Sequence, residues 1–393
     1  MRDGWRFETL GEISDVTMGR QLSPSKKLGT RPRPYIRAAN IGSSGISLNE
    51  IFEMDFTEAE ERRFATQIGD TLLVEGGNEK SVGCPGLVTE KEAGLCIQNT
   101  VIRCRVKDPK VFHPRFQYQV LRYMYWRGDF AELCAGTTIM HLGQKRAELV
   151  PILLPPLAEQ KRIVDLISSV DSYIEALGQQ LERAKISRNA VLHALLAAGG
   201  DGWVETPLVE AVEVLDRFRK PVNSTEREKR KGNVPYYGAN GQTGWIDDFL
   251  FNEELVLLGE DAIDFLDPNA RKAYLISGPS WVNNHAHILR VLPERAVSYL
   301  LAEALNRVDY SQYVSFGTRS KLTQSSMNGI KIMLPPLPEQ KRIVDLISTV
   351  DSFIDALEGQ ISSSTSLRSG LLSDLLSGNH EIPSSYDQLI GAA

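Results

Sequence analysis

The sequence predicts an α+β protein in which two mixed α/β domains are each followed by a long helix. The two helices are expected to pair antiparallel as a coiled coil, related by a pseudo-twofold axis. Three observations predict this fold: a nearly identical segment occurs twice, apolar residues follow each copy at helical spacing, and weaker matches link the remaining segments. A length of 393 residues, with 42% apolar and 24% charged residues, suits two or three globular domains and excludes a disordered or fibrous chain.

One segment occurs twice in the chain. The first copy, Leu154–Leu177, reads LPPLAEQKRIVDLISSVDSYIEAL, and the second, Leu334–Leu357, reads LPPLPEQKRIVDLISTVDSFIDAL. Only four of the aligned positions differ, which indicates a duplication. The proline pair in each copy disfavours helix upstream, and Gly199-Gly200 and Gly378 favour helix ends downstream. Each copy therefore predicts a helix of about 40 residues, roughly 60 Å long.

Apolar residues line one face of each predicted helix. They recur at alternating steps of four and three residues, which is the heptad spacing of a coiled coil. The spacing continues at Val191 and at Leu371, but it is interrupted at Arg188, Ser364 and Arg368, where either another protein packs or the coil loosens. The predicted seam residues are Ile163, Ile167, Val170, Ile174 and Leu177 in the first helix and Ile343, Ile347, Val350, Ile354 and Leu357 in the second.

The segments outside the helices are predicted to be two related globular domains. Gly4-Trp5 matches Gly202-Trp203 and Ala39-Asn40 matches Ala239-Asn240, whereas most other positions have diverged. We predict a first domain at 1–155, a helix at 156–199, a second domain at 200–335, a helix at 336–379 and a tail at 380–393. Local patterns predict strands at Thr71–Val74, Thr100–Val106, Leu255–Leu258, Ala273–Ile276 and Ala286–Val291, and helices at Phe112–Phe130 and Glu294–Arg307.

Positive charge is concentrated locally, although the net charge of the whole chain is −6. The stretch 20–37 carries six basic residues and no acid, and 217–231 carries seven basic residues against two acids. Because the two stretches follow the start of their domains by similar distances, we favour loops that touch nucleic-acid phosphates over two solvated surface loops. The candidate phosphate contacts are Arg20, Lys26, Lys27, Arg33, Arg37, Arg217, Arg219 and Lys220.

Further candidate contacts come from three polar segments. Small, hydroxyl-bearing and basic residues after Gly136 and Gly317 suit either close approach to a nucleic-acid backbone or a turn into a strand. The loop at 235–244 offers amide side chains that can pair with adenine, and its first-domain counterpart is Asn40. The pair His285 and His287 fits a structural role or a base or phosphate contact better than a metal site, because no third ligand is evident. The candidates are Thr137, Thr138, Lys145, Arg319, Lys321, Tyr237, Asn240, Gln242 and His285.

Several classes of site are absent from the sequence. Cys84, Cys96, Cys104 and Cys134 form no CxxC pair, so buried free thiols are expected rather than a zinc site or disulfides. The chain has no GxxxxGK[ST] loop, HExxH motif or Asn/Asp-Pro-Pro-Tyr/Phe motif. No catalytic, cofactor-binding or metal-binding residues are therefore predicted. The N-terminus has no apolar core of a signal peptide and no apolar run could span a bilayer, so we expect a cytoplasmic protein.

The chain resembles the specificity (S) subunit of type I restriction–modification systems. The resemblance rests on LPPLAEQKRI and LPPLPEQKRI, each of which follows a divergent domain with a Gly-Trp start, and it covers the whole chain. It implies that each target-recognition domain reads one half of a bipartite double-stranded DNA sequence, while the helix pair sets the spacer and docks two methyltransferase (M) subunits. S-adenosylmethionine would bind the M subunits, and ATP and Mg would act in a restriction (R) subunit where one is present. This chain would catalyse nothing, in agreement with the missing motifs.

One alternative function is a coiled-coil scaffold that binds only proteins and has no DNA specificity. Such a scaffold would show no salt-dependent affinity for DNA. A DNA-processing enzyme is disfavoured by the missing motifs, and it would require a metal or a cofactor with this chain alone.

Overall fold

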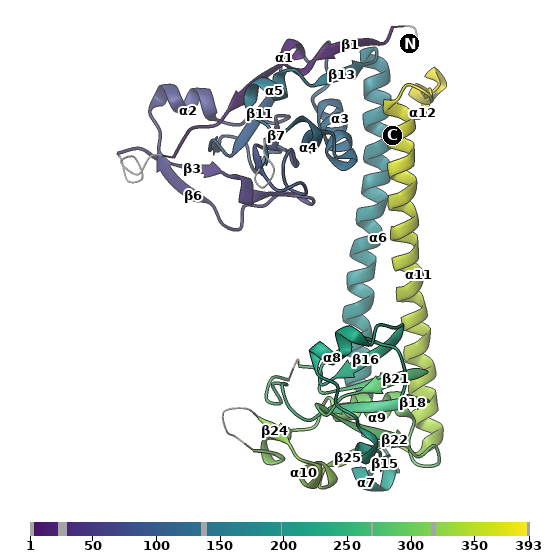
Figure 1. The fold of residues 1–393 in the computed structure, drawn as a ribbon. Coiled ribbons are helices and arrows are strands. Elements are labelled where there is room, and N and C mark those ends of the chain that lie inside the picture. The colour runs from purple at the N-terminus through teal and green to yellow at the C-terminus, as the bar shows by residue number, and fades with distance from the viewer. Residues whose placement is uncertain are drawn as a thin grey trace. The chain divides into compact units, whose positions relative to one another are not determined.

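A computed structural model describes residues 4–22, 30–134, 140–197, 199–268, 270–315 and 320–390. The chain forms two compact units: the first comprises Met1–Gly178 with Gly359–Ala393, and the second comprises Gln179–Glu358. The boundaries fall within the two long helices, α6 (Leu157–Ala197) and α11 (Leu337–Leu376). Each unit therefore contains one globular domain together with segments of both helices (Figure 1).

The domain of the first unit is built on a four-stranded antiparallel sheet with the order β2-β11-β7-β9. A second sheet has the order β10-β3-β6, and β1 pairs with β13 just before α6. The strands are β1 (Arg6–Thr9), β2 (Ser14–Met18), β3 (Pro32–Ile36), β4 (Ile41–Gly42), β5 (Gly45–Ile46), β6 (Phe52–Asp55), β7 (Thr71–Val74), β8 (Gly76–Gly77), β9 (Pro85–Leu87), β10 (Cys96–Ile97), β11 (Val101–Val106), β12 (Met140–His141) and β13 (Pro151–Leu154). The helices are α1 (Leu10–Ile13), α2 (Glu58–Phe64), α3 (Pro114–Arg127), α4 (Asp129–Leu133) and α5 (Gln144–Glu148), with a 3-10 turn at Ala38–Asn40.

The domain of the second unit repeats this plan. Its main sheet has the order β15-β22-β19-β20, its second sheet the order β17-β16-β21-β18, and β14 pairs with β25 just before α11. The strands are β14 (Val204–Pro207), β15 (Val212–Val214), β16 (Val234–Gly238), β17 (Gly241–Ile246), β18 (Phe251–Asn252), β19 (Leu255–Gly259), β20 (Ala273–Ile276), β21 (Pro279–Val282), β22 (Ala286–Val291), β23 (Val314–Ser315), β24 (Lys321–Leu322) and β25 (Lys331–Leu334). The helices are α7 (Leu208–Ala211), α8 (Ser224–Lys229), α9 (Ser298–Leu305) and α10 (Gln324–Asn328), with 3-10 turns at Asp216–Phe218 and Tyr310–Gln312. The segment after α11 belongs to the first unit and contains a 3-10 turn at Ser384–Tyr386 and the helix α12 (Asp387–Ile390).

The shared strand order confirms that the duplication includes the globular domains. All five predicted strands are present, three of them with the bounds expected from their apolar runs. The aromatic segment Phe112–Phe130 forms α3 and the start of α4, separated by Gly128 in the left-handed conformation. The second predicted helix, Glu294–Arg307, is shorter in the structure, where α9 begins only at Ser298.

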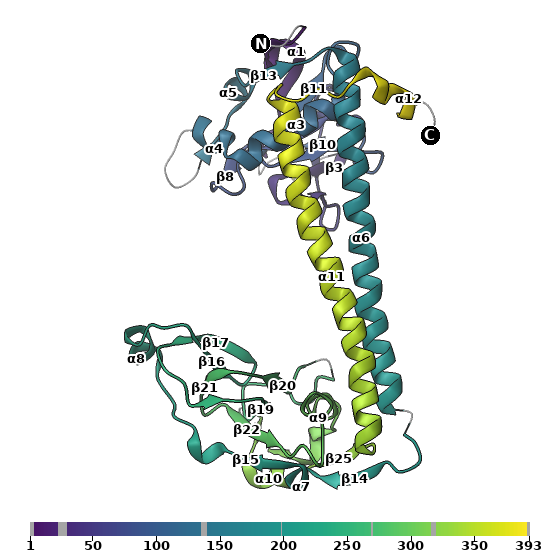
Figure 2. The same ribbon diagram turned by 90° about the vertical axis from the view of Figure 1, so that its right-hand side faces the viewer.

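Within each unit, the segments of the two long helices lie side by side and run in opposite directions (Figure 1, Figure 2). In the first unit the beginning of α6 packs against the end of α11, since Ile163 and Ile167 share an apolar cluster with Leu372 and Leu375. In the second unit the end of α6 packs against the beginning of α11, where Leu192 shares a cluster with Ile343 and Ile347. The antiparallel pairing expected from the sequence is therefore present.

Burial along the seam follows the heptad prediction near the start of each helix. Ile163, Ile167, Leu177, Ile343, Ile347, Ile354 and Leu357 are buried, and Val170, Ile174 and Val350 are half-buried. Farther along, the prediction is wrong by one residue, because Val191 is exposed while Leu192 is buried. Likewise Leu372 is fully buried and the predicted Leu371 only half-buried.

A buried glutamine joins each globular domain to its long helix. Gln160 accepts a hydrogen bond from the backbone N–H of His113 at 2.8 Å and donates to the carbonyls of Val111 at 2.9 Å and Pro155 at 2.8 Å. It thereby satisfies backbone groups at the start of α3. Both side-chain polar atoms of this residue are used inside the protein, and the residue has no exposed surface.

The same junction occurs at the second repeat. Gln340 accepts from the N–H of Val297 at 2.8 Å and donates to the carbonyls of Arg295 at 3.2 Å and Pro335 at 2.9 Å. Val297 and Arg295 lie at the start of α9, in the position that α3 occupies in the first domain, and Pro335 lies just before α11. The glutamine of the repeated EQKR segment is therefore a structural connector in both copies.

A glycine turn completes each junction. Gly4 and Gly202 have φ values of +79° and +84°, which L residues rarely adopt. A Cβ atom at Gly4 would lie 3.0 Å from the Cγ of Pro156, and one at Gly202 would lie 3.2 Å from the Cγ of Pro336. The matched Gly-Trp and Pro-Pro pairs of the sequence thus meet in space.

None of the helices in the described parts of the chain is long and apolar enough to cross a membrane.

Candidate nucleic-acid interface

The first basic loop contributes less free charge than its sequence suggests. Arg20 is only 7% exposed, its Nε lies 3.0 Å from Glu60 Oε1, and its guanidinium lies over the Phe56 ring. Arg20 also donates to the carbonyl of Asp55. These contacts use the side chain within the domain, so its phosphate contact stays a prediction that the geometry does not favour. Lys26 and Lys27 lie outside the described residues.

Arg33 and Arg37 reach the surface with an acidic neighbour each. Arg33 Nε lies 2.9 Å from Glu61, and Arg37 Nη2 lies 2.6 Å from Glu50. Their side chains are 42% and 24% exposed, so Coulomb attraction to the carboxylates is screened by water. Both arginines remain candidate phosphate contacts.

The Asn40 side chain is bound within its own domain. Its side chain accepts from the backbone N–H of Arg37 at 3.0 Å and donates to the carbonyls of Ser47 and Glu50, both at 3.0 Å. The residue is 4% exposed. The amide thus holds the turn that follows β3, and its contact with a base edge stays a prediction that the geometry does not favour.

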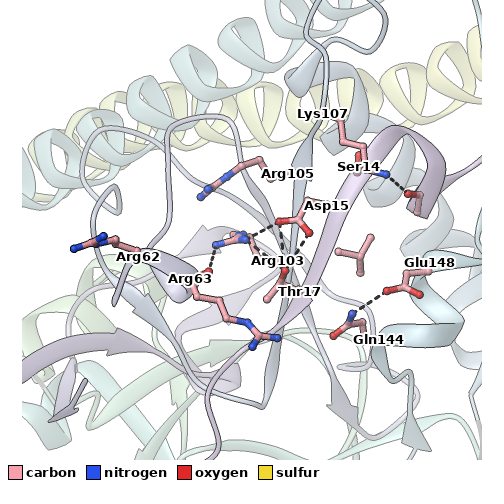
Figure 3. A pocket seen from close by; sticks show the side chains of 12 residues that line it. Ser14, Asp15, Thr17, Arg62, Arg63, Arg103, Arg105, Lys107, Gln144 and Glu148 are labelled. Atoms are coloured by element: carbon pink, nitrogen blue, oxygen red, sulfur yellow. Dashed lines mark hydrogen bonds and ion pairs between the residues drawn. The ribbon is translucent and has the colours of Figure 1, made fainter. Parts of the chain in front are cut away.

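A polar hollow of about 540 Å³ lies on the first domain, beside β2 and β11 (Figure 3). We call it the basic hollow, and its charged and polar side chains come from distant parts of the chain. In Figure 3 the arginines lie on one side and Gln144 and Glu148 on the other. The lining residues are Gly11, Ser14, Asp15, Val16, Thr17, Arg62, Arg63, Arg103, Arg105, Lys107, Gln144 and Glu148.

The inner arginines of the basic hollow are fixed by protein contacts. Arg103 is 3% exposed and donates to Asp15 at 3.0 Å and to the carbonyls of Arg63 and Ala65. Its Nε is buried without a hydrogen-bond partner. Burial has the largest effect on the pKa of Arg103 and lowers it, and repulsion from the neighbouring Arg105 lowers it further. Arg103 thus keeps unsatisfied donor capacity beside the hollow.

The outer cations are accessible. Arg62 has an 81% exposed side chain, with Glu58 at 3.4 Å, and Arg63 and Lys107 are also exposed. A neighbouring hollow of about 540 Å³ shares Arg63 and Gln144 with the basic hollow. The sequence reasoning missed this surface because Arg62 and Arg63 sit in an acid-rich helix, and the strand arginines show no basic run. The alternation of Arg103 and Arg105 on an otherwise apolar strand was the signal that could have indicated it.

In the second domain, as in the first, some of the predicted basic residues are exposed and others are bound within the domain. Arg217 and Lys220 are exposed. Arg219 instead lies in a network, with its Nη1 2.5 Å from Glu260 and its Nη2 3.4 Å from Asp216. The donors of Arg219 bind carboxylates and backbone carbonyls of the same domain, so its phosphate contact stays a prediction that the geometry does not favour.

The polar loop at 235–244 forms a hairpin of β16 and β17 with a bulge near Tyr237. Gln242 and Asn240 are exposed, although Asn240 also donates to the carbonyl of Ala262 at 3.0 Å. The Tyr237 ring is half-buried, 6.2 Å from the ring of Tyr274. Gln242 donates to the carbonyl of Gly244 on its own strand at 3.1 Å. Its amide therefore stays on the surface of the hairpin, where a base edge could reach it.

The two histidines have different environments. His287 is buried, with Nδ1 2.5 Å from Asp216 and Nε2 2.9 Å from the carbonyl of Leu322, which is a structural role. His285 precedes β22 on the surface, with Nδ1 2.8 Å from Asp261. No cluster of three or more His, Cys, Asp or Glu side chains that could hold a metal occurs among the described residues.

The cysteines are free, and burial raises the pKa of Cys96 to about 11.

The remaining candidates lie around the loops that precede α5 and α10. Lys145 is exposed on α5, and Lys321 is half-exposed with Nζ 2.9 Å from Glu260. Thr137, Thr138 and Arg319 lie outside the described residues. The candidate cations that reach the surface in the described parts of the chain include Arg33, Arg37, Arg62, Arg63, Lys107, Lys145, Arg217, Lys220 and Lys321.

Comparison with known proteins agrees with this duplicated architecture. The family model of the type I restriction modification DNA specificity domain matches twice, at residues 2–185 and 200–364. The chain belongs to this family. Each match covers one globular domain and most of the helix that follows it.

Three curated relatives are specificity subunits. A putative type I restriction enzyme specificity subunit from Haemophilus influenzae is 31% identical over 40% of each chain. The StySPI specificity subunit from Salmonella potsdam is 20% identical over 69% of this chain and 65% of that one. The alignments thus span less than two thirds of these two relatives. The putative MjaX specificity subunit from Methanocaldococcus jannaschii is 21% identical over 90% of this chain and 88% of that one.

Solved structures share the fold. The S subunit of a type I restriction-modification system from M. genitalium aligns with a TM-score of 0.54 and 18% identity, over 95% of this chain and 96% of that one. A chain from a structural study of type I R-M complex assembly and conformational transition aligns with a TM-score of 0.63 and 18% identity, over 96% and 98% of the two chains.

Proposed function

We propose that this chain is the DNA specificity subunit of a type I restriction–modification complex, and that each globular domain reads one half of a bipartite DNA target. One observation carries the proposal: two domains with the same strand order present different side chains. Arg103 on β11 pairs with Thr17 on β2, whereas β22 carries Ile288 at the equivalent place, where its carbonyl accepts a hydrogen bond from the N–H of Leu215 just after β15. Two recognition surfaces that share one fold but carry different side chains would suit two half-sites with different base sequences.

In this proposal the exposed cations hold the DNA backbone. Lys and Arg side chains supply most sequence-independent affinity by displacing counterions from phosphates. Arg62, Arg63 and Lys145 would serve in the first domain, and Arg217 and Lys220 in the second. Gln242 would contact a base edge, because its amide can pair with adenine in the major groove.

The partners follow from the same proposal. The helix pair would dock two methyltransferase subunits, which bind S-adenosylmethionine, and would set the spacer between the half-sites. A restriction subunit using ATP and Mg would join complexes that also cleave DNA. This chain would contribute recognition and no catalytic residue, and it would act in the cytoplasm.

Methylome sequencing tests this function. Cells carrying the chain with its cognate methyltransferase subunit are compared with cells lacking only this chain. We expect a gapped, bipartite methyladenine motif that disappears without the chain. If the chain makes no difference and the purified protein shows no salt-dependent DNA affinity, the coiled-coil scaffold is the correct function.

The role of the basic hollow is tested by binding titrations over a range of salt concentrations. Replacing Arg62 and Arg63 with alanine should weaken binding to all sequences and reduce the slope of log K against log salt by about one to two. Arg183→Ala, an exposed arginine on α6, is the matched control. A loss confined to one base position would contradict a phosphate role.

A further inference from the structure

Two arginines interrupt the apolar seam, and each finds an aspartate on the other long helix. In the second unit Arg188 of α6 binds Asp351 of α11, with Nε 2.7 Å and Nη2 3.3 Å from the carboxylate oxygens. In the first unit Arg368 of α11 binds Asp171 of α6 through Nε and through Nη2 at 3.1 Å. Both pairs are bidentate, the most directional form of ion pair.

The two pairs are copies of each other. Arg368 and Asp351 occupy the positions of the second copy that match Arg188 and Asp171 in the first, at the same offset as the two LPPL starts. In an antiparallel helix pair, a step backwards along one helix corresponds to an equal step forwards along the other. The step back from Arg188 to Asp171 is as long as the step forward from Asp351 to Arg368, so the two pairs specify one register.

Each arginine also touches its globular domain. Arg368 donates to Gln119 of α3 at 3.1 Å, and its guanidinium lies 4.9 Å from the ring centroid of Trp126. Arg188 donates to the hydroxyl of Tyr299 on α9. Each side chain therefore joins three helices: both long helices and the domain helix that packs against them.

The burial of the two arginine side chains makes the loss of their aspartate partners energetically costly. The Arg368 side chain is 3% exposed and that of Arg188 is 20% exposed, whereas Asp171 and Asp351 keep access to water. A shift of one helix by a single turn, about 5.4 Å, would leave both arginines without their carboxylates. Leaving a buried charge unpaired is far more costly than misplacing a leucine, and single polar residues in coiled coils specify register in this way.

We propose that Arg188–Asp351 and Arg368–Asp171 are positioning pairs that fix the register of the helix pair and the seating of each domain on it. This inference rests on the proposed function, in which the helix pair sets the spacer. The pairs would thereby determine spacer specificity and leave the identity of the half-site bases unchanged. Hydrophobic packing holds the helices together, and the ion pairs select one alignment among several.

The first test is methylation by the purified complex with its methyltransferase subunits. The DNA panel carries both half-sites with the cognate spacer or with one base pair more or less. We expect the double variant Arg188→Met with Asp351→Leu to lose at least tenfold in discrimination between spacers, with unchanged preference at each half-site base. The swapped pair, Arg188→Asp with Asp351→Arg, should restore discrimination.

A matched control is the exposed interhelical pair Lys185–Glu358, whose side chains are 43% and 51% exposed at 2.8 Å. Lys185→Met with Glu358→Leu should leave spacer discrimination unchanged. Discrimination within twofold of the parent in the Arg188 double variant would overturn the inference. Equal losses in the control pair would also overturn it, because any helix substitution would then suffice.

A second readout does not depend on methylation. Spin labels at the exposed positions Arg183 and Asp355 report the register directly, in a chain in which Cys134 is replaced by serine. We expect one narrow distance in the parent and a broadened or shifted distribution in the Arg188 double variant. An unchanged distribution refutes the register role. A parent complex that methylates no bipartite DNA refutes the proposed function alone, because the label distances still test the register.

Discussion

Replacing Gln160 with leucine should destabilise the first unit. The leucine fits the volume of the buried side chain but makes none of the three hydrogen bonds of Gln160, two of which link α6 to the segment that leads into α3. The backbone N–H of His113 and the carbonyls of Val111 and Pro155 would then be buried without that partner. The repeat makes Gln340→Leu the equivalent change in the second unit.

The magnitude follows from these three groups. A buried polar group without a partner costs about 1–3 kcal/mol, so three such groups cost about 3–9 kcal/mol. The additional apolar burial of leucine offsets about 1–2 kcal/mol. We therefore expect a net loss of about 1–8 kcal/mol, which in a unit of this size lowers Tm by roughly 2–30 °C.

Scanning calorimetry of the full chain measures this change. Gln180→Leu, an exposed glutamine on the same helix, is the control and should shift Tm by no more than about 1–2 °C. If Gln160→Leu and Gln180→Leu unfold at the same temperature, the junction does not hold α3 to α6 and the reasoning is wrong.

Three further outcomes are expected. Asn40→Ala should cost about 2–3 kcal/mol in denaturant unfolding, because its buried side chain makes three hydrogen bonds to the surrounding backbone; near-parent stability with weaker DNA binding would favour its predicted role in base contact. Gly4→Ala should cost about 1–2 kcal/mol through its positive φ, whereas Gly42→Ala, with open space at Cβ, should cost well under about 1 kcal/mol; equal Tm values would contradict this difference. Burial raises the pKa of Glu260, but hydrogen bonds from Arg219 and Lys321 lower it more, and the net pKa lies below the usual value. The stabilisation is thus present above the ordinary glutamate pKa and is lost as pH falls through the lowered value, and Glu260→Gln should flatten this part of the stability profile against pH.

Much of the fold could be predicted from the sequence because the signals were local or repeated. Apolar runs such as Ala273–Ile276 are buried strands because their length and residue types allow little else. The long helices were predictable because two nearly identical stripes carry the same period and the same proline boundary. The family resemblance rested on those same residues, and the matches at 2–185 and 200–364 confirm it.

The roles of single charged residues could not be predicted, because their partners lie far away in the sequence. Arg20 read as part of a basic loop, yet Glu60 and the Asp55 carbonyl hold it inside the domain. Arg188 and Arg368 read as defects of the seam for the same reason. A count of charges along the chain cannot show which of them meet a carboxylate after folding.

The far end of the seam was mispredicted because a strict heptad assumes about 3.5 residues per turn. At about 3.6 residues per turn the buried face drifts by about 20° in each heptad. After four heptads from Ile163 the drift amounts to roughly 80°, so Leu192 replaces Val191 on the buried face. The second helix behaves alike, because Leu372 lies as far beyond Ile343 as Leu192 lies beyond Ile163.

The composition of the first unit has a consequence for biosynthesis. Its core contains Leu372 and Leu375, which pack in one cluster with residues of α3 and the start of α6. The ribosome completes 1–178 long before these leucines, and at about 5–20 residues per second the gap of roughly 200 residues takes roughly 10–40 s. During that interval the first domain is a nascent chain with an exposed apolar face, while the contiguous second unit can already fold. The domain that is made first is thus the last to be finished, and a premature stop codon near the end of the gene would damage the beginning of the protein.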